Sequence, residues 1–382
     1  MTTPEIDMPQ GRQPVTGITR SDSRPLPRRA VDSPSMTPRL EMLVESCGTN
    51  PNSREGQLAI DLIRTALKSL TDQTGVGERK LMTRSLKEIR HAYRIFAGYP
   101  QTRKISIFGS ARTPADHPDY AAAVSFSREM ANLGWLAITG AGDGIMKAGH
   151  EGPGSSASFG LAIRLPFENT ANTIITGDAK LIHFNYFFTR KLIFLSHSDA
   201  VAAFPGGLGT QDELLETLTL MQTGKAPIAP VVLVAGENSD YWQLWADFMS
   251  RGLVAAGLAD ADDLQLAYIA ASPRDAVEHV RRFYANYHSA RYVGNEYVLR
   301  VREPLRPWQL QELQKEFSFL VADGRIRQSG ALPEETDHLD LPRIRFEHTK
   351  RNYAAIRRLI DRINDFQLAS RAAGRPKQVS HY

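Results

Sequence analysis

The sequence contains a single cysteine, Cys47, in 382 residues. One cysteine excludes an internal disulfide framework and favours a reducing compartment. No apolar run reaches the roughly 18 residues that a membrane-spanning helix needs, and residues 1–30 lack the apolar core of a signal peptide. We therefore expect a cytoplasmic protein with no membrane partner.

A strong excess of charge is also missing. Lysine and arginine total 46 against 42 aspartate and glutamate, which gives a net charge of +4 at pH 7. This mild excess gives little support to nucleic-acid binding, so no nucleic-acid partner is expected. Hydrophobic residues make up 42% of the chain and charged residues 23%, which are ordinary globular values and allow a sizeable core.

Two familiar phosphate-binding patterns are absent as well. Residues 224–226 read Gly-Lys-Ala, so the P-loop pattern GxxxxGK[ST] is not completed. The stretch TGAGDGIM, residues 139–146, reads GxGxG instead of the dinucleotide pattern GxGxxG. His183 and His197 lack the spacing of metal ligands. The sequence therefore predicts neither a metal ion nor an organic cofactor.

The chain divides by composition into four segments. Residues 1–40 contain seven prolines and few large apolar side chains, so we predict a disordered tail. Residues 41–99 are predicted to form a helical extension, because apolar residues recur at helical spacing and Thr74–Gly77 interrupts them. Residues 100–292 are predicted to form a Rossmann-like domain, and residues 293–382 a small C-terminal α+β module.

The third segment alternates short apolar runs with amphipathic helical patterns. Strands are expected over 105–108, 136–139, 159–163, 201–204 and 230–234, and helices near 118–133, 186–197, 210–222 and 239–251. This alternation is typical of right-handed βαβ units, and therefore of an α/β fold with a doubly wound parallel sheet. Ligands bind beyond the carboxyl ends of such strands, where three glycine-containing turns follow, at 109–110, 140–144 and 205–210.

The third turn, Pro205-Gly206-Gly207-Leu208-Gly209-Thr210, leads directly into a helical pattern. Glycines there expose backbone N–H groups at the positive end of the helix, which is a site for a phosphate. Glycine can equally serve tight packing in a turn between a strand and a helix, so the turn by itself leaves both interpretations open. Glu213 follows three residues after Thr210, about 5 Å farther along the helix axis.

The longer string PGGLGTQDE, residues 205–213, resembles the PGGxGTxxE signature of the LOG ("Lonely Guy") family, phosphoribohydrolases that act on nucleoside 5′-monophosphates. Arg190-Lys191 lies at the family's usual distance upstream. Phe108–Ser110 resembles the opening turn of the family, and 140–146 resembles its GGGxxGLM turn with one glycine replaced by alanine. The resemblance covers roughly residues 100–290, and the extensions at both ends resemble those of the long bacterial members.

This resemblance implies that Arg190 and Glu213 are the catalytic residues. The phosphate is expected at four residues of the glycine turn, namely Gly206, Gly207, Gly209 and Thr210. Further substrate contacts are expected from Gly109, Ser110, Gly140, Gly142, Asp143, Met146, Lys191 and Thr217. The implied partners are a nucleoside 5′-monophosphate and further copies of the chain, in a homodimer or a higher homo-oligomer.

Charge considerations explain why such a pair suits the reaction. Cleaving an N-glycosidic bond builds positive charge on the sugar carbon, which the carboxylate of Glu213 can stabilise while it orients a water molecule. Arg190 would face the leaving base or the phosphate. The expected products are the free base and ribose 5-phosphate, from a purine or pyrimidine nucleotide such as AMP or from a cytokinin riboside monophosphate. The alternative is a carrier that binds a nucleotide or phosphorylated cofactor without cleaving it.

Basic residues also gather near the C-terminus, at Lys350, Arg351, Arg357, Arg358 and Arg362. They suggest the hypothesis that the terminal extensions bind an anionic effector. A solvated helix surface that covers the edge of the sheet is the alternative.

Overall fold

The computed structural model describes residues 30–72, 74–165 and 171–373. The chain forms two compact units, with the boundary between Arg84 and Ser85. This boundary falls inside one helix, α3 (Val76–Phe96), so α3 contributes to both units. None of the described helices is long and apolar enough to cross a membrane.

The first unit is helical. It contains the short helix η1 (Ala30–Asp32), α1 (Met36–Ser46), α2 (Arg54–Thr71) and the first part of α3. Leu40 and Val44 of α1 pack against Ile60 of α2. The disordered tail predicted for residues 1–40 is therefore wrong for residues 36–40, because the apolar stripe of α1 begins there and is buried. The rest of that prediction falls mainly on residues 1–29, which lie outside the described residues.

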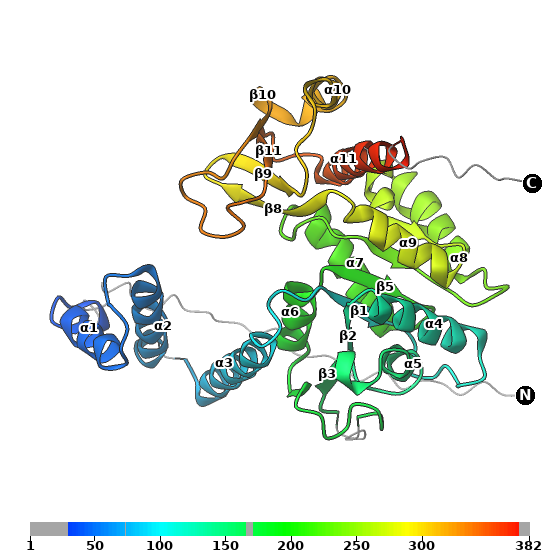
Figure 1. The fold of residues 1–382 in the computed structure, drawn as a ribbon. Coiled ribbons are helices and arrows are strands. Elements are labelled where there is room, and N and C mark those ends of the chain that lie inside the picture. Colours follow the sequence, from blue (N-terminus) through cyan, green and yellow to red (C-terminus); the bar gives the residue numbers. More distant parts are fainter. Residues whose placement is uncertain (1–29, 73, 166–170, 374–382) are drawn as a thin grey trace, which may run out of the picture. The chain divides into compact units, whose positions relative to one another are not determined.

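A parallel sheet organises the second unit (Figure 1). Its strands are β1 (Lys104–Phe108), β2 (Leu136–Thr139), β3 (Ser158–Ile163), β4 (Leu181–Phe184), β5 (Ala200–Ala203), β6 (Val231–Leu233) and β7 (Ala267–Ile269). They lie in the order β4-β3-β2-β1-β5-β6-β7. The direction of chain progress reverses between β1 and β5, where a doubly wound sheet opens a crevice beyond its carboxyl ends. The predicted Rossmann-like fold is confirmed.

Helices cover both faces of this sheet. The buried side chains of α4 (Pro118–Asn132), α5 (Ile145–Glu151) and α9 (Pro273–Phe283) pack on one face. Those of α6 (Phe187–His197), α7 (Leu208–Gln222) and α8 (Tyr241–Phe248) pack on the other. Short helical segments follow at η2 (Ser155–Ala157), η3 (Met249–Val254) and η4 (Ala261–Leu266). In Figure 1, α4 and α5 lie on the opposite side of the sheet from α6 and α7.

The central strand shows why the sequence forms a sheet buried on both faces. All five residues of β1 are buried. Ile105 and Ile107 contribute to the core under α4, α5 and α9, whereas Phe108 points to the opposite core. Continuous burial of this kind is expected of a parallel strand with helices on both sides.

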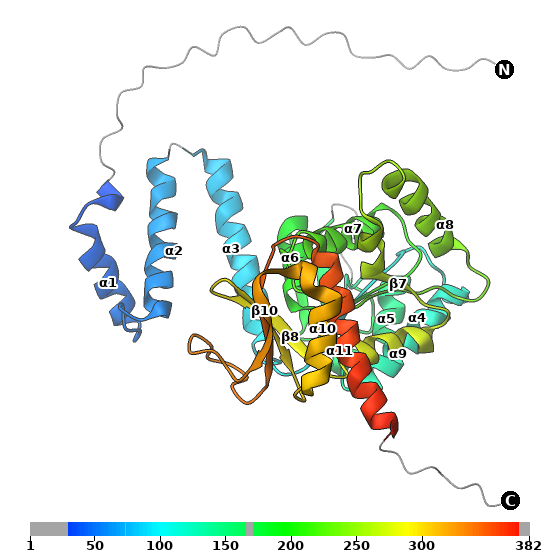
Figure 2. The same cartoon turned by 90° about the horizontal axis from the view of Figure 1, so that it is seen from above.

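An antiparallel sheet completes the second unit. It contains β8 (Tyr287–Val293), β9 (Glu296–Val301), β10 (Val321–Ser329) and β11 (Arg343–His348), in the order β10-β11-β9-β8. Two helices, α10 (Pro307–Phe317) and α11 (Tyr353–Ala373), lie side by side next to it, and η5 (Ser318–Leu320) links α10 to β10 (Figure 2). Buried side chains of this sheet, of α11 and of α7 belong to one continuous hydrophobic core.

The basic face that suggested an anionic effector is largely neutralised by ion pairs. Arg357 is only 4% exposed, and it donates to both carboxylate oxygens of Asp361. Further ion pairs join Arg358 to Asp262 and Arg362 to Glu312. The structure therefore favours the alternative, a helix surface that packs on the rest of the unit.

Candidate functional site

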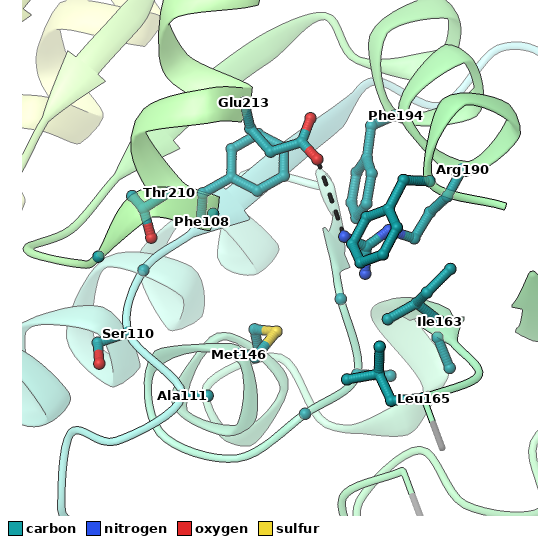
Figure 3. A pocket seen from close by; sticks show the side chains of 18 of the residues that line it. Phe108, Ser110, Ala111, Met146, Ile163, Leu165, Arg190, Phe194, Thr210 and Glu213 are labelled. Carbon is teal, nitrogen blue, oxygen red and sulfur yellow. Dashed lines mark ion pairs between the residues drawn. The ribbon is translucent and has the colours of Figure 1, made fainter. Parts of the chain in front are cut away.

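A cavity of about 990 Å³ opens beyond the carboxyl ends of β1, β2, β3 and β5 (Figure 3). Its wall is formed by the turns that follow these strands and by the first turns of α6 and α7. The cavity therefore lies at the reversal of chain direction, where this class of fold binds its ligands.

The turn between β5 and α7 supplies backbone amides to the cavity. Gly207 is the N-cap of α7, and a Cβ added to Gly207 or Gly209 would meet no atom within 4 Å. The first N–H groups of a helix have no partner inside the helix, so the start of α7 can bind an anion by donating hydrogen bonds to it. Gly206 differs, because a Cβ there would lie 2.2 Å from Thr210 Oγ1. Gly206 thus serves the packing of the turn, and Gly207 and Gly209 leave room for a ligand.

Hydrogen bonds join this turn to the turns after β1 and β2. The amide of Ser110 donates to the carbonyl of Pro205 at 3.1 Å, and the amide of Ile145 donates to the carbonyl of Ser110 at 3.0 Å. A Cβ on Gly109 would lie 2.5 Å from Ile145 Cγ2, so the close approach requires glycine there. The three glycine turns predicted from the sequence therefore form one connected rim.

Arg190 of α6 and Glu213 of α7 point toward each other in the wall of the cavity (Figure 3). Their closest charged atoms, Arg190 Nη2 and Glu213 Oε1, are 3.9 Å apart. Both side chains are largely buried, at 14% and 7% exposure. Within the described part of the chain, Arg190 Nε and Glu213 Oε2 have no hydrogen-bond partner. Buried polar atoms are normally paired, so both side chains lack part of the hydrogen bonding that their burial calls for.

Burial shifts the acid–base properties of both side chains. It raises the pKa of the Glu213 carboxyl to about 7, although Lys191 and Arg190 act to lower that pKa. It also lowers the pKa of the Arg190 guanidinium, against the attraction of Glu213. Each group has lost water without gaining a close partner, which disfavours its charged form. A carboxyl with a pKa near neutrality can exchange a proton at physiological pH, as catalytic carboxyls do.

Lys191, next to Arg190, is occupied by other carboxylates. Its Nζ lies 2.6 Å from Asp212 and 2.7 Å from Glu216, and 3.9 Å from Glu213. Burial acts to lower the pKa of Lys191, but the hydrogen bonds to Asp212 and Glu216 outweigh it and raise the pKa. Lys191 therefore remains a cation that ties α6 to the outer side of α7.

Most of the site residues predicted from the sequence line the cavity. They are Gly109, Ser110, Gly140, Gly142, Met146, Arg190, Gly207, Gly209, Thr210 and Glu213. Gly206 and Lys191, with the contacts given above, are not part of its wall. Asp143 is exposed to solvent, and the hydroxyl of Thr217 donates to the backbone carbonyl of Glu213 at 2.7 Å. These four residues shape or support the site from outside the cavity.

The cavity also has lining residues that the sequence did not reveal. An apolar part of the wall consists of Phe108, Ala162, Ile163, Leu165, Phe187, Phe194 and Leu208, and three basic side chains, Arg112, Arg164 and His183, lie at its edge. Phe187 could have been found, because it lies three residues before Arg190 and so on the same face of α6. Phe194 lies four residues after Arg190 on the same helix, and Phe108 and Leu208 stand inside the motifs quoted above. The others lie on or after β1, β3 and β4 and belong to no motif.

A buried network fixes the turn after β2, where Ala141 stands in place of the family's glycine. Ala141 has a φ of +62°, which costs a non-glycine residue roughly 1–2 kcal/mol. Its amide donates to Thr139 Oγ1 at 3.0 Å, and its carbonyl accepts from the amide of Asn172 at 2.8 Å. The Asn172 side chain donates to the carbonyl of Gly142 at 2.9 Å, and Nε2 of buried His150 lies 2.9 Å from Thr139 Oγ1. These contacts hold the turn in the strained conformation.

Residues 140–280 match the protein family described as "Possible lysine decarboxylase", which includes the LOG proteins. This match supports the resemblance of the central segment to the LOG family. The match contains the Arg190–Glu213 pair and the glycine turns after β2 and β5, and the LOG family supports a nucleotide-related function. The further likeness to the long bacterial members stays a prediction.

Several solved structures resemble about half of the chain. The molybdenum cofactor binding protein from the phototrophic bacterium Rippkaea orientalis is 22% identical over 47% of this chain and 96% of its own, with a TM-score of 0.35. The molybdenum cofactor carrier protein from Chlamydomonas reinhardtii is 20% identical over 48% and 98%, with a TM-score of 0.34. DNA processing protein A from Helicobacter pylori is 14% identical over 47% and 80%, with a TM-score of 0.34. No curated protein sequence matches the chain.

Proposed function

We propose that this protein hydrolyses the N-glycosidic bond of nucleoside 5′-monophosphates to the free base and ribose 5-phosphate. The observation that carries the proposal is the facing pair of Arg190 and Glu213, which is buried and incompletely hydrogen-bonded inside the cavity. The pair lies beside a turn that offers amides to an anion. A ligand with a phosphate, a polar sugar and a flat base suits such a cavity.

The phosphate would occupy the start of α7. Gly207 and Gly209 leave the amides accessible, and Thr210 adds a hydroxyl. Each hydrogen bond to a charged group contributes about 1.5–3 kcal/mol, so several of them would dominate the affinity for the nucleotide. The apolar wall, which includes Ile163 and Leu165, would then face the base.

The reaction requires a water molecule and proton transfers. The bond between C1′ and the base nitrogen breaks, the water oxygen bonds to C1′, the water gives up one proton and the base nitrogen gains one. Ionised Glu213 would stabilise the positive charge that develops on the sugar and accept the proton of the attacking water. Arg190 would offset negative charge on the departing base or on the phosphate.

A lysine decarboxylase activity, which the family description names, is not favoured by this cavity. That chemistry forms a Schiff base between a lysine and pyridoxal phosphate. Among the residues that the structure describes, no lysine lines the cavity. The neighbouring Lys191 is held by Asp212 and Glu216.

A carrier that binds a phosphorylated ligand without cleaving it is the second candidate. It would use the same turn before α7, but it has no need of a buried carboxylate with a pKa near 7. Burial of Glu213 disfavours its ionised form and raises its pKa. Such a shift is useful to an enzyme whose carboxyl transfers a proton, and a carrier does not need it. The carboxylate is therefore the feature that favours hydrolysis.

The proposal includes a second copy of the chain as a partner. Large apolar side chains are exposed on neighbouring surfaces of α6 and α7, namely Phe187, Phe188, Leu192 and Leu215. A homodimer that covers them would bury these side chains and enclose one side of the cavity, because Phe187 also lines it.

A panel of substrates tests the function. The purified protein is incubated with AMP, GMP, CMP, UMP and a cytokinin riboside monophosphate, and the released base is measured by chromatography. We expect release from at least one nucleotide, no release from the matching nucleoside, and release slowed by about 10²–10⁴ in Glu213→Gln. Tight binding of a nucleotide without any release would reject hydrolysis and support the carrier.

A further inference from the structure

Glu88 of α3 is a buried carboxylate at the beginning of α6, within the second unit. It is 7% exposed. Its Oε1 accepts hydrogen bonds from the backbone amide of Asn185 at 2.9 Å and from the Asn185 side chain at 2.7 Å. Its Oε2 accepts from the hydroxyl of Thr189 at 2.6 Å. All of these donors are neutral, and all belong to the turn in which α6 starts.

The beginning of α6 has no such support of its own. The N-cap residue, Tyr186, provides no side-chain hydrogen bond, and the first turn contains no acidic residue. By contrast, α2 and α9 are each capped by their own serine, Ser53 and Ser272. A carboxylate at a helix N-terminus satisfies free donors and interacts favourably with the helix dipole. Glu88 supplies the favourable negative charge from another helix, and its hydrogen bonds go to Asn185, just before the N-cap, and to the Thr189 hydroxyl.

The turn that Glu88 holds is the turn that carries Arg190. Thr189 is fully buried and directly precedes Arg190, whose amide donates to the carbonyl of Tyr186 at 3.3 Å. The Arg190 guanidinium lies 5.1 Å from the centre of the Phe187 ring, in the same turn. The direction of the Arg190 side chain therefore depends on how the start of α6 is fixed.

We infer that Glu88 is a positioning residue for Arg190. By binding Asn185 and Thr189, it sets the first turn of α6 and so the place of the guanidinium opposite Glu213. The effect on turnover rests on the proposed hydrolysis, whereas the effect on Arg190 itself does not. The turn before α7 is held by other contacts, such as the hydrogen bond from the Ser110 amide to the carbonyl of Pro205, and is not part of this role.

Two variants separate this role from general stability. Glu88→Gln keeps the shape of the side chain but brings an amide donor toward the donors of α6. Thr189→Val keeps Glu88 and removes one hydrogen bond. Because small displacements of a catalytic group reduce rates steeply, we expect each to lower kcat/KM on the order of 10-fold. Glu78→Gln, at an exposed position of the same helix, is the matched control and should change nothing.

The decisive measurement is a double-mutant cycle with Arg190→Gln. If Glu88 acts through Arg190, Glu88→Gln lowers kcat/KM in the wild-type background and has almost no further effect once Arg190 is replaced. Thermal unfolding of each variant checks that it is folded at the assay temperature, so that the kcat/KM values compare folded proteins. Equal reductions in both backgrounds, or wild-type kinetics for both single variants, would overturn the inference.

The same cycle remains informative if the protein cleaves no nucleotide. In that case the proposed hydrolysis fails, and the dissociation constant of AMP, measured by calorimetry, replaces kcat/KM. Weaker AMP binding by Glu88→Gln only in the presence of Arg190 supports the positioning role. Equal effects with and without Arg190, including no effect in either, contradict it.

Discussion

The ring of Tyr353, at the start of α11, lies directly against Gly224, just beyond the end of α7. A Cβ on Gly224 would be 2.2 Å from Tyr353 Cζ. The Tyr353 hydroxyl lies 2.8 Å from the hydroxyl of Tyr292 on β8. The helix that carries Glu213 is thus anchored at its far end by the C-terminal part of the chain.

This contact predicts that Gly224→Ala is unusually destabilising. Gly224 and Gly257 have nearly the same φ, +68° and +69°, but a Cβ on Gly257 would meet nothing within 4 Å. Gly257→Ala should therefore lower the free energy of unfolding by about 1–2 kcal/mol from the backbone alone. Gly224→Ala should lose roughly a further 1–3 kcal/mol from overpacking. Urea unfolding measures both, and equal losses would show that the Tyr353 ring moves aside freely.

Replacing the proposed catalytic carboxylate should separate chemistry from binding. Glu213→Gln should reduce kcat by about 10²–10⁴ and leave the affinity for AMP close to that of the wild type, because the phosphate binds at the start of α7. Glu216→Gln, one turn away and bound to Lys191, is the control and should retain most activity. Near-wild-type turnover by Glu213→Gln would reduce Glu213 to a structural role.

The raised pKa of Glu213 predicts how stability depends on pH. The folded-state pKa of about 7 exceeds the ordinary value of 4.5, so the folded protein holds this proton more tightly than the unfolded chain. The contribution of Glu213 to the free energy of unfolding is complete below pH 4.5. It declines as the pH rises to about 7, by about 3 kcal/mol in total. Glu213→Gln should therefore gain stability relative to the wild type between pH 5 and pH 8. Thermal unfolding at both pH values checks this, and a constant difference would contradict it.

The two adjacent glycines of the phosphate turn should respond differently to alanine. At Gly207 there is open space and a φ of −82°, so Gly207→Ala should fold normally but block the approach of the phosphate. The loss of one such hydrogen bond corresponds to about 10- to 150-fold weaker nucleotide binding. Gly206→Ala should instead lower the melting temperature, because its Cβ would contact Thr210. Calorimetry with AMP and thermal unfolding distinguish the two, and unchanged AMP affinity in Gly207→Ala would place the phosphate elsewhere.

The proposed dimer can be tested with a charge on its expected surface. Phe188→Glu and Leu192→Glu place carboxylates on the exposed apolar face of α6, and burying them unpaired would be costly. We expect the wild type to be a dimer by light scattering and both variants to be monomers. Leu244→Glu, at an equally exposed apolar position of α8, should remain a dimer. A monomeric wild type would reject the proposal.

The strands that the sequence predicted are those in which a clear apolar run leads into a glycine or proline. Two strands of the parallel sheet escaped prediction for physical reasons: β4 contains His183 in four residues, and β7 has only three residues, all partly exposed. Their hydrophobic signal is too short to exceed that of the surrounding loops. By contrast, α9 could have been predicted, because Ser272 caps it and Pro273 occupies its first turn.

The candidate site was partly predictable for a similar reason. Glycine turns and the Arg190–Glu213 pair lie in local motifs, so they are visible in one sequence. Glu88 is 101 residues from Thr189, and Asn172 is 30 residues from Gly142. Contacts between such distant residues depend on the folded topology and leave no pattern along the chain. The supporting groups of the site therefore became visible only in the structure.

The hydrophobic core shared by the two sheets has a practical consequence for dissecting this protein. A fragment cut to residues 140–280 would lack β1, the central strand of its own sheet, and the buried partners of α7 from the C-terminal sheet. Residues 85–382 should instead melt in one cooperative transition, as expected of elements that share a core. The segment that matches the family model is therefore smaller than the segment that we expect to fold as one unit.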